Sequence, residues 1–211
     1  MKLRDSENTL VLGVFLCLVA LVAAAALAWV SGITKRPIER AKEKNRNAML
    51  KCLNLPKFDR TGSSVEIGER KFSTVSNTGR IAGFVGEGKA KGYGGDIEAM
   101  VGFDLDGRIT GVQILKHKET PGLGANVCDR TFKRTILNLF AKAPDVPGNG
   151  YLDQFAGRPA SGAGNWRTKK DGGEFVYHTG ATVTSRAVVD LVNGIASDFA
   201  KSRKTIEERS K

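Results

Sequence analysis

The chain has few of the side chains from which metal sites and nucleic-acid interfaces are built. Its 211 residues include only two histidines and three cysteines, and no two cysteines have the CxxC spacing of a metal or redox motif. Aromatic residues make up 7% of the composition and form no base-stacking or groove-reading pattern. We therefore expect no metal site and no nucleic-acid partner.

Catalytic motifs are missing as well. The glycines around Tyr93 do not form a GxGxxG sequence at a strand-to-helix turn, which argues against NAD binding. No nucleophile stands beside a base and no carboxylates cluster, so no catalytic residue is predicted. His117 and His178 receive no catalytic role, because most such histidines are structural or solvated. A Cys52–Cys128 disulfide is compatible with a location outside the cytoplasm, but nothing in the sequence requires it.

Charge is absent from residues 8–34. Within this run, the 21 residues LVLGVFLCLVALVAAAALAWV would span about 30 Å of hydrocarbon as a helix rising about 1.5 Å per residue. We expect a short tail over residues 1–9 and a transmembrane helix over residues 10–31. The alternative is a signal peptide cleaved after Ala28, which would release a secreted soluble enzyme. The apolar run is longer than a typical signal and continues past that site, which favours a retained anchor.

The segment that follows the apolar run is strongly basic, within a chain of net charge +11. A basic segment beside a membrane helix typically meets anionic lipid headgroups, and we interpret residues 32–58 as a helical stalk that contacts lipid. Only Lys2 and Arg4 precede the run, so the positive-inside rule alone would place the next domain in the cytoplasm. The cations after the run are Lys35, Arg36, Arg40, Lys42, Lys44, Arg46 and Lys51.

Residues 59–202 have the pattern of one α+β domain, with a sheet rich in antiparallel strands and flanking helices. The stretch DIEAMVGFDLDGRITGVQIL alternates apolar and polar residues on both sides of Asp106-Gly107, which predicts a β-hairpin. A second hairpin is predicted to turn at residues 171–173, and a short helix is predicted around residues 130–140.

A closing helix is predicted from the apolar spacing near the C-terminus. It would begin at Thr184 or Ser185, because hydroxyl side chains commonly cap helix starts. Residues 203–211 are highly charged and are expected to form a frayed tail. The side chains expected on the buried face of this helix are Ala187, Val188, Leu191, Val192, Ile195 and Phe199.

The sequence ETPGLG, residues 119–124, combines a rigid proline with two glycines. Pro121 fixes one backbone dihedral, and the glycines permit conformations and close approaches that other residues exclude. Leu123 projects between the two glycines, where it could contact a flat ligand. By itself this segment is more typical of an ordinary strand-to-helix connection.

The sequence HTGATVTSR, residues 178–186, places hydroxyls and a glycine at the expected helix start. Unpaired backbone N–H groups and the positive end of the helix dipole stabilise a phosphate at such a position. Gly180 and Ala181 are small enough to let a phosphate lie on the chain, and the Thr182 hydroxyl would be its neighbour. The alternative is that these residues only form a turn and a helix cap.

Taken together and in this order, the motifs identify a family. The chain resembles the FMN-binding G subunit of the Rnf electron-transport complexes and the related C subunit of the sodium-translocating NADH:quinone reductase. The resemblance covers nearly the whole chain from the anchor to the final helix, and the compact length is more similar to the Rnf subunit. The stretches that carry it are TKRPIERA, GYGGDIEAMVGFDLDGRITGV, HKETPGLG and TGATVTSRAVVDLV.

The resemblance implies a covalent FMN cofactor. In the family, the phosphate of FMN is joined to the last threonine of an [ST]GAT motif, here Thr182, by a separate flavin transferase. The flavin would contact Glu119, Thr120, Leu123 and Gly124 on one side. On the other side it would contact Thr179, Gly180, Ala181, Val183 and Thr184.

The resemblance also implies a function and a location. The chain would be an electron-transfer subunit in a complex that couples electron transfer of the ferredoxin/NAD type to ion translocation, with other membrane subunits as partners. It would sit in the bacterial inner membrane with its soluble domain on the periplasmic side, against the positive-inside count.

One position departs from the family pattern. Members often carry aspartate three residues before the [ST] of the motif, and here that position is Val176. If the transferase recognises that carboxylate, attachment to Thr182 is in question. The alternative function is therefore a membrane-tethered binding or assembly module that has the fold without covalent flavin.

Overall fold

The computed structural model describes residues 3–131, 144 and 146–209, and of residues 3–10 and 35–48 it describes the backbone only. The chain divides into two compact units, Met1–Asn47 and Ala48–Lys211.

The first unit is helical. Helix α1 spans Leu3–Lys51, and its 24-residue segment Val11–Thr34 contains an 18-residue window with a mean hydropathy of 2.9. The side chains of this segment are exposed along its whole length. The helix is long and apolar enough to cross a membrane, as the uncharged run predicts.

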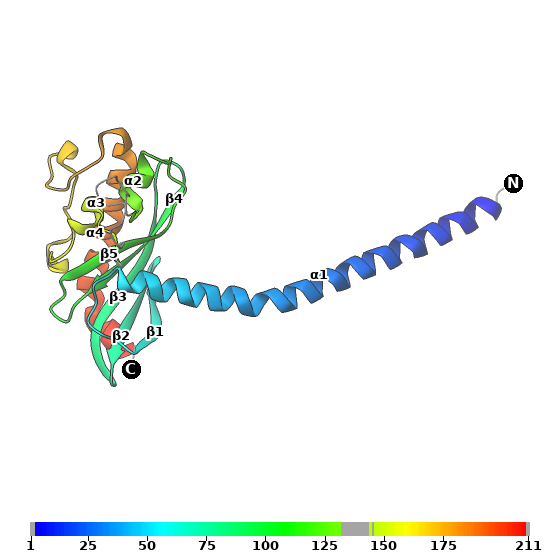
Figure 1. The fold of residues 1–211 in the computed structure, drawn as a ribbon, viewed down its shortest axis with the longest axis horizontal. Coiled ribbons are helices and arrows are strands. Elements are labelled where there is room, and N and C mark those ends of the chain that lie inside the picture. Colours follow the sequence, from blue (N-terminus) through cyan, green and yellow to red (C-terminus); the bar gives the residue numbers. More distant parts are fainter. Residues whose placement is uncertain (1–2, 132–143, 145, 210–211) are drawn as a thin grey trace. The chain divides into compact units, whose positions relative to one another are not determined.

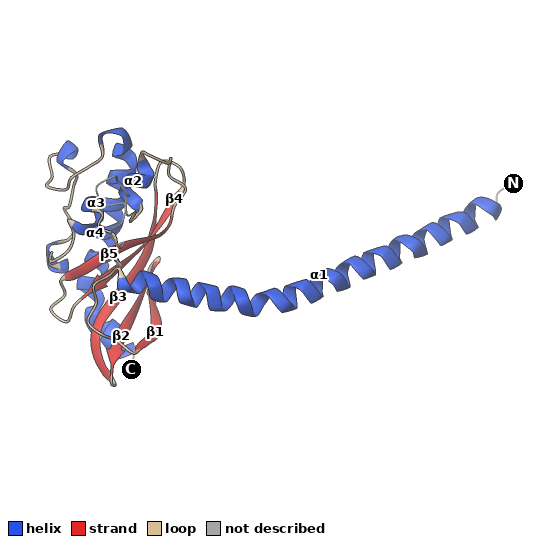
Figure 2. Ribbon diagram, viewed as in Figure 1, coloured by secondary structure: helices blue, strands red, loops and turns tan. Residues whose placement is uncertain are grey.

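The second unit is built on a sheet of five antiparallel strands in the order β1-β2-β3-β4-β5 (Figure 2). The expected α+β class and antiparallel sheet are confirmed. The β4–β5 hairpin turns at Asp106-Gly107, where Gly107 has the left-handed φ of 77° that favours glycine. The strands are β1 (Arg60–Ile67), β2 (Arg70–Asn77), β3 (Arg80–Lys91), β4 (Asp96–Phe103) and β5 (Ile109–Lys116).

Both faces of the sheet are covered. The long helix α4, Thr182–Arg209, packs along one face, where Figure 1 shows it in orange to red. Alternation along β4 places Ile97, Ala99, Val101 and Phe103 in the core under this helix. The opposite face buries a smaller cluster of side chains, namely Leu50, Leu53, Val75, Val85 and Met100. Because Met100 is buried there, β4 contributes to both apolar layers.

Phe199 of α4 is the centre of the larger core. Its ring stacks on Phe103 at 4.1 Å between centroids and lies 5.2 Å from Phe84 and 6.3 Å from Phe72. Such aromatic contacts add to the burial of apolar area. Phe199 therefore joins α4 to β2, β3 and β4, which fixes the helix on the sheet.

Helix α4 differs from the sequence interpretation at both ends. It begins at Thr182, directly after a 3-10 turn at Thr179–Ala181, and not at Thr184 or Ser185. At its C-terminal end it continues through Arg209, and Ile206 is fully buried. Residues 203–209 are thus an ordered part of the helix, because one apolar side chain in a charged segment reaches the core.

The predicted second hairpin is wrong, although its turn is present. Lys169–Asp171 form a 3-10 turn that ends at Gly172 with φ 79°, and one isolated bridge joins Thr168 to Phe175. Thr168 and Arg186 both bond the Asp171 carboxylate, so side-chain bonds organise this segment instead of a strand ladder. Most of the helix predicted around residues 130–140 lies outside the described residues. The other short helices are α2 (Gly124–Cys128), α3 (Gly150–Asp153) and a 3-10 turn at Ala160–Gly162.

Cys52 and Cys128 are not joined by a disulfide. The backbone of Cys52 lies against Gly111 beside the smaller core, whereas Cys128 is buried in the core under α4. The two cysteines thus lie in different surroundings, and no bond joins them in this fold.

We predict that Phe199→Ala lowers the free energy of unfolding by about 3–5 kcal/mol, because it leaves a cavity among three other phenylalanines. Thermal and urea unfolding of the full chain in detergent would measure the loss. The exposed Lys201→Ala on the same helix is the control, with an expected change within about 0.5 kcal/mol. Equal effects of the two substitutions would contradict the central place of Phe199.

Candidate functional site

One cavity of about 320 Å³ gathers the motifs that the sequence singled out. It lies between the β3–β4 turn, the loop after β5 and the start of α4. All ten residues to which the family resemblance assigns flavin contacts line it, and Tyr93 completes its lining. The full set is Tyr93, Glu119, Thr120, Leu123, Gly124, Thr179, Gly180, Ala181, Thr182, Val183 and Thr184.

Glu119 connects the three parts of this cavity. Its side chain is buried, with 5% of the residue exposed. One carboxylate oxygen accepts the Thr184 hydroxyl of α4 at 2.6 Å, and the other accepts the Gly94 N–H of the β3–β4 turn at 3.0 Å. A buried carboxylate needs such partners, because leaving it without hydrogen bonds would be costly. Glu119 is therefore a structural connection between the walls.

Glycines are required where these parts meet. A Cβ on Gly92 would lie 2.3 Å from a Glu119 carboxylate oxygen, and a Cβ on Gly94 would lie 2.1 Å from the Lys118 carbonyl oxygen. A Cβ on Gly124 would lie 2.6 Å from the other Glu119 oxygen. The glycines of the β3–β4 turn and of the ETPGLG loop thus allow a close approach to Glu119 and to its neighbour Lys118.

Leu123 joins the two motifs directly. A Cβ added to Gly180 would come within 2.9 Å of the Leu123 side chain, so the leucine packs against the bare backbone of the TGAT turn. The Leu123 side chain is still 44% exposed, and the neighbouring Val183 is 49% exposed. The cavity therefore has an apolar rim that remains open to a ligand.

The hydroxyls at the start of α4 have separate tasks. Ser185 donates to the Ala181 carbonyl oxygen and accepts the His178 N–H, while Thr184 donates to Glu119. The interpretation of Thr184 or Ser185 as the helix cap is wrong, because both lie inside the helix and bond elsewhere. The preceding turn is capped by His178, whose Nδ1 accepts the Gly180 N–H at 3.2 Å. Thr182 is half-buried at the first position of α4 and faces the cavity.

The histidines make structural contacts. Nδ1 of His117 accepts the Glu119 N–H, and its Nε2 lies 2.8 Å from an Asp129 oxygen, so this ring holds the start of the ETPGLG loop.

The Cys128 thiol lies close to the same carboxylates. Burial raises the pKa of this thiol to about 12, and the carboxylates of Glu119 and Asp129 act in the same direction. Cys128 is consequently a neutral, buried thiol at physiological pH.

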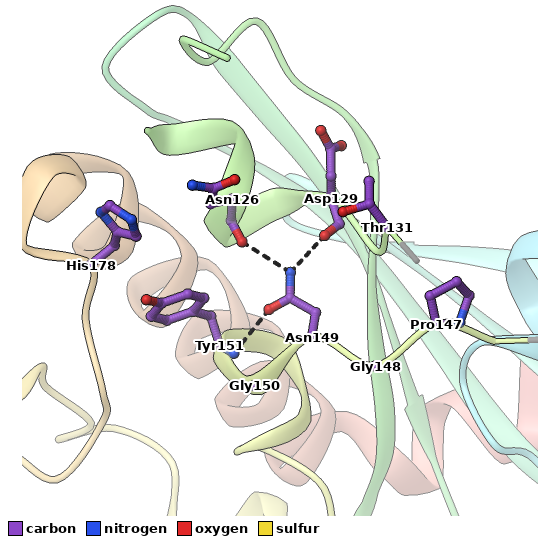
Figure 3. A pocket seen from close by; sticks show the side chains of 9 residues that line it. All are labelled: Asn126, Asp129, Thr131, Pro147, Gly148, Asn149, Gly150, Tyr151 and His178. Atoms are coloured by element: carbon purple, nitrogen blue, oxygen red, sulfur yellow. Dashed lines mark hydrogen bonds between the residues drawn. The ribbon is translucent and has the colours of Figure 1, made fainter. Parts of the chain in front are cut away.

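A second cavity of about 470 Å³ is lined in part by His178 (Figure 3). Its walls include Tyr151, whose ring centroid is 5.9 Å from that of His178, and Asn149, whose amide donates to the Asp129 carbonyl oxygen. Asn149 also accepts the Tyr151 N–H and so caps α3. None of the residues for which a flavin contact is predicted lines this second cavity.

Val176 lies in an exposed segment whose backbone is bonded to Gln154. Val176 is 46% exposed, and its backbone is held by Gln154, which accepts the Val176 N–H at 2.7 Å and donates to its carbonyl oxygen.

Asp171, five residues before Val176 in the sequence, pairs with Arg186 at the exposed start of α4. Hydrogen bonds from Arg186 and then Thr168 lower the pKa of Asp171 to about 2.

Tyr93 is the lining residue for which the sequence predicts no role. It stands in a glycine cluster that belongs to one of the family-like stretches and does not match a dinucleotide motif. An exposed aromatic between glycines gives no periodic signal, because turns do not repeat. Its placement follows from the Gly94–Glu119 bond, a contact between residues 25 positions apart.

We predict that Glu119→Ala destabilises the domain by about 2–3 kcal/mol, because it leaves the Gly94 N–H and the Thr184 hydroxyl without their charged acceptor. Glu119→Gln should recover most of the loss, since its oxygen can accept from Gly94 and its amide can donate to Thr184. Urea unfolding of the full chain in detergent would compare the three proteins. If the alanine variant were as stable as the original protein, Glu119 would not be the connection described above.

Comparison with known proteins places this geometry in a family. Residues 92–197 match the FMN-binding domain model. Curated relatives, each named as the G subunit of an ion-translocating oxidoreductase complex, include one from Cereibacter sphaeroides, 31% identical across 95% of this chain and 89% of its own length. One from Pseudomonas aeruginosa is also 31% identical, across 95% of this chain and 91% of its own.

The fold agrees with that of a solved structure. The C subunit of the Na⁺-translocating NADH-quinone reductase from Parabacteroides distasonis superposes with a TM-score of 0.52, over 79% of this chain and 96% of that one, at 18% identity. At this identity the likeness concerns the fold alone. With the domain match and the full-length relatives, however, the chain belongs to the FMN-binding G-subunit family of the ion-translocating oxidoreductase complexes.

Proposed function

We propose that this protein is a membrane-anchored electron carrier of an ion-translocating oxidoreductase complex, with FMN bound covalently through its phosphate to Thr182. The observation that carries the proposal is the cavity built jointly by the ETPGLG and TGAT motifs, with a half-buried threonine at the start of a long helix. The names of the relatives support the complex, and the domain match supports FMN.

The start of α4 fits a phosphate. Aligned peptide dipoles of this 28-residue helix favour an anion at its N-terminus. Gly180 has no side chain and Ala181 has only a methyl group, so neither obstructs an approach to Thr182. Thr179 and Thr182 both line the cavity. A phosphoester at Thr182 would place the phosphate where these features coincide.

The remaining walls fit the rest of FMN. Leu123 and Val183 offer apolar surface at the rim. Thr120 and Gly124 line the loop side, and the Glu119 oxygens are already bonded to the protein, so Glu119 acts by shaping the cavity. The volume of about 320 Å³ is near the lower end of the roughly 300–1,000 Å³ typical of small-molecule sites, so a bound flavin would keep part of its surface exposed. The cofactor would supply the redox chemistry, while the chain positions it.

The anchor and the basic segment set the cellular context of the proposal. Residues 11–34 would cross the bacterial inner membrane, and the cations of residues 35–51 would meet lipid headgroups. We place the soluble domain on the periplasmic side, as in the family that the sequence resembles. Neighbouring membrane subunits can fix an orientation that the lysine and arginine count opposes. A flavin transferase on the same side would attach the cofactor.

We predict that the purified full chain, co-expressed with a competent flavin transferase, shows flavin fluorescence in its band on a denaturing gel. Thr182→Val should abolish the fluorescent band, because the substitution replaces the hydroxyl by a methyl group of similar size. Thr182→Ser is the matched control and should keep the band, since it retains a hydroxyl at the same position.

Two results would count against this function. A band without flavin in the unsubstituted protein would favour the assembly module that lacks covalent cofactor, with Val176 as the first position to change to aspartate. Fluorescence that persists in Thr182→Val would move the attachment site to another residue.

A further inference from the structure

We infer that Tyr93 is the aromatic wall of the flavin cavity and that its ring packs against the isoalloxazine ring. This inference rests on the proposed function for the identity of the ligand. Tyr93 lines the same cavity as the two motifs but belongs to a third element, the β3–β4 turn. It thereby adds a wall that neither motif supplies.

The turn that carries Tyr93 is fixed on both sides of the tyrosine. Before it, the Gly92 N–H donates to the Gly95 carbonyl oxygen at 2.8 Å. After it, the Gly94 N–H donates to Glu119 at 3.0 Å. Gly92 and Gly94 approach Glu119 and Lys118 so closely that neither position has room for a Cβ. The backbone of Tyr93 is therefore held in place.

The side chain of Tyr93, in contrast, has no partner among the described residues. It makes no ring stacking, cation–π contact or hydrogen bond there, and 75% of the residue is exposed. One exposed ring is ordinary, but exposed apolar side chains gathered around one cavity mark a binding surface. Tyr93 lines the cavity, so the partner that fits its ring is a flat ring held there.

Exposed apolar residues of the soluble domain gather around this cavity. Outside α1, five large apolar residues of the described chain are strongly exposed, and three of them, Tyr93, Leu123 and Val183, line this cavity. They come from three different elements that Glu119 connects. Leu123 and Val183 belong to the loop and to α4, so a flat ligand between them and Tyr93 would be covered by protein from more than one side.

The second cavity provides an internal comparison. Tyr151 lines it, but the Tyr151 ring already packs near His178 and the core (Figure 3). An aromatic ring that already packs against protein has less free apolar surface for a ligand to cover. If the isoalloxazine ring lay in the second cavity, Tyr151 would contact it and Tyr93 would not.

Flavin fluorescence in the native protein tests this assignment. A phenol in contact with a flavin quenches its emission, because the phenol lends an electron to the excited flavin and recovers it when the pair relaxes. We expect Tyr93→Leu to raise native fluorescence per flavin several-fold, and Tyr93→Trp to keep it quenched. Tyr151→Leu is the matched control and should leave it unchanged. Flavin per chain is measured separately on a denaturing gel, so a change in loading cannot be mistaken for a change in quenching.

A second arm separates this inference from the covalent bond. Free FMN is titrated into the full chain made without the transferase, with the expectation that the unsubstituted chain and Tyr151→Leu quench it and Tyr93→Leu does not. This outcome supports Tyr93 even if Thr182 carries no flavin. Unchanged quenching in Tyr93→Leu, a rise in Tyr151→Leu, or no flavin binding by the unsubstituted chain in either arm would overturn the inference.

Discussion

The two hydrogen bonds of the buried Glu119 carboxylate are the interaction on which the site depends. They join a loop to a turn 25 residues earlier and to a helix 65 residues later. Hydrogen bonds to a charged group are stronger than those between neutral groups, and a buried charge that lost them would be strongly unfavourable. One side chain therefore links all three walls of the cavity and need not touch the chemistry itself.

This connection is possible only because the sheet and α4 place its partners. Phe199 and its aromatic neighbours fix α4 on β2, β3 and β4, while Gly86 leaves room for Ile195 against the sheet. With the helix fixed, Thr184 bonds the loop after β5, and Thr182 lies two residues earlier at the cavity. Packing in the core thus determines the geometry of the site from a distance, as is usual for a rigid scaffold that carries functional loops.

The sequence predicts the parts of the fold that have local signals. The β4–β5 hairpin follows from alternation and Asp106-Gly107, and the two motifs come together in one cavity. The helix start differs from the prediction because Thr184 and Ser185 resemble caps, whereas their hydroxyls bond Glu119 and Ala181. A hydroxyl has several ways to be satisfied, and the choice here depends on a residue far away in the sequence. The burial of Ile206 is likewise a tertiary effect, invisible in a segment otherwise made of charges.

We propose that Glu119, the TGAT turn and α4 together present Thr182 to the phosphate of FMN. The most direct measurement is mass spectrometry of the tryptic peptide DGGEFVYHTGATVTSR from the full chain, co-expressed with a flavin transferase. Fragmentation separates Thr182 from Tyr177, Thr179, Thr184 and Ser185. We expect the mass of FMN less one water on Thr182 alone. An unmodified peptide, or FMN on another of these hydroxyls, would contradict it.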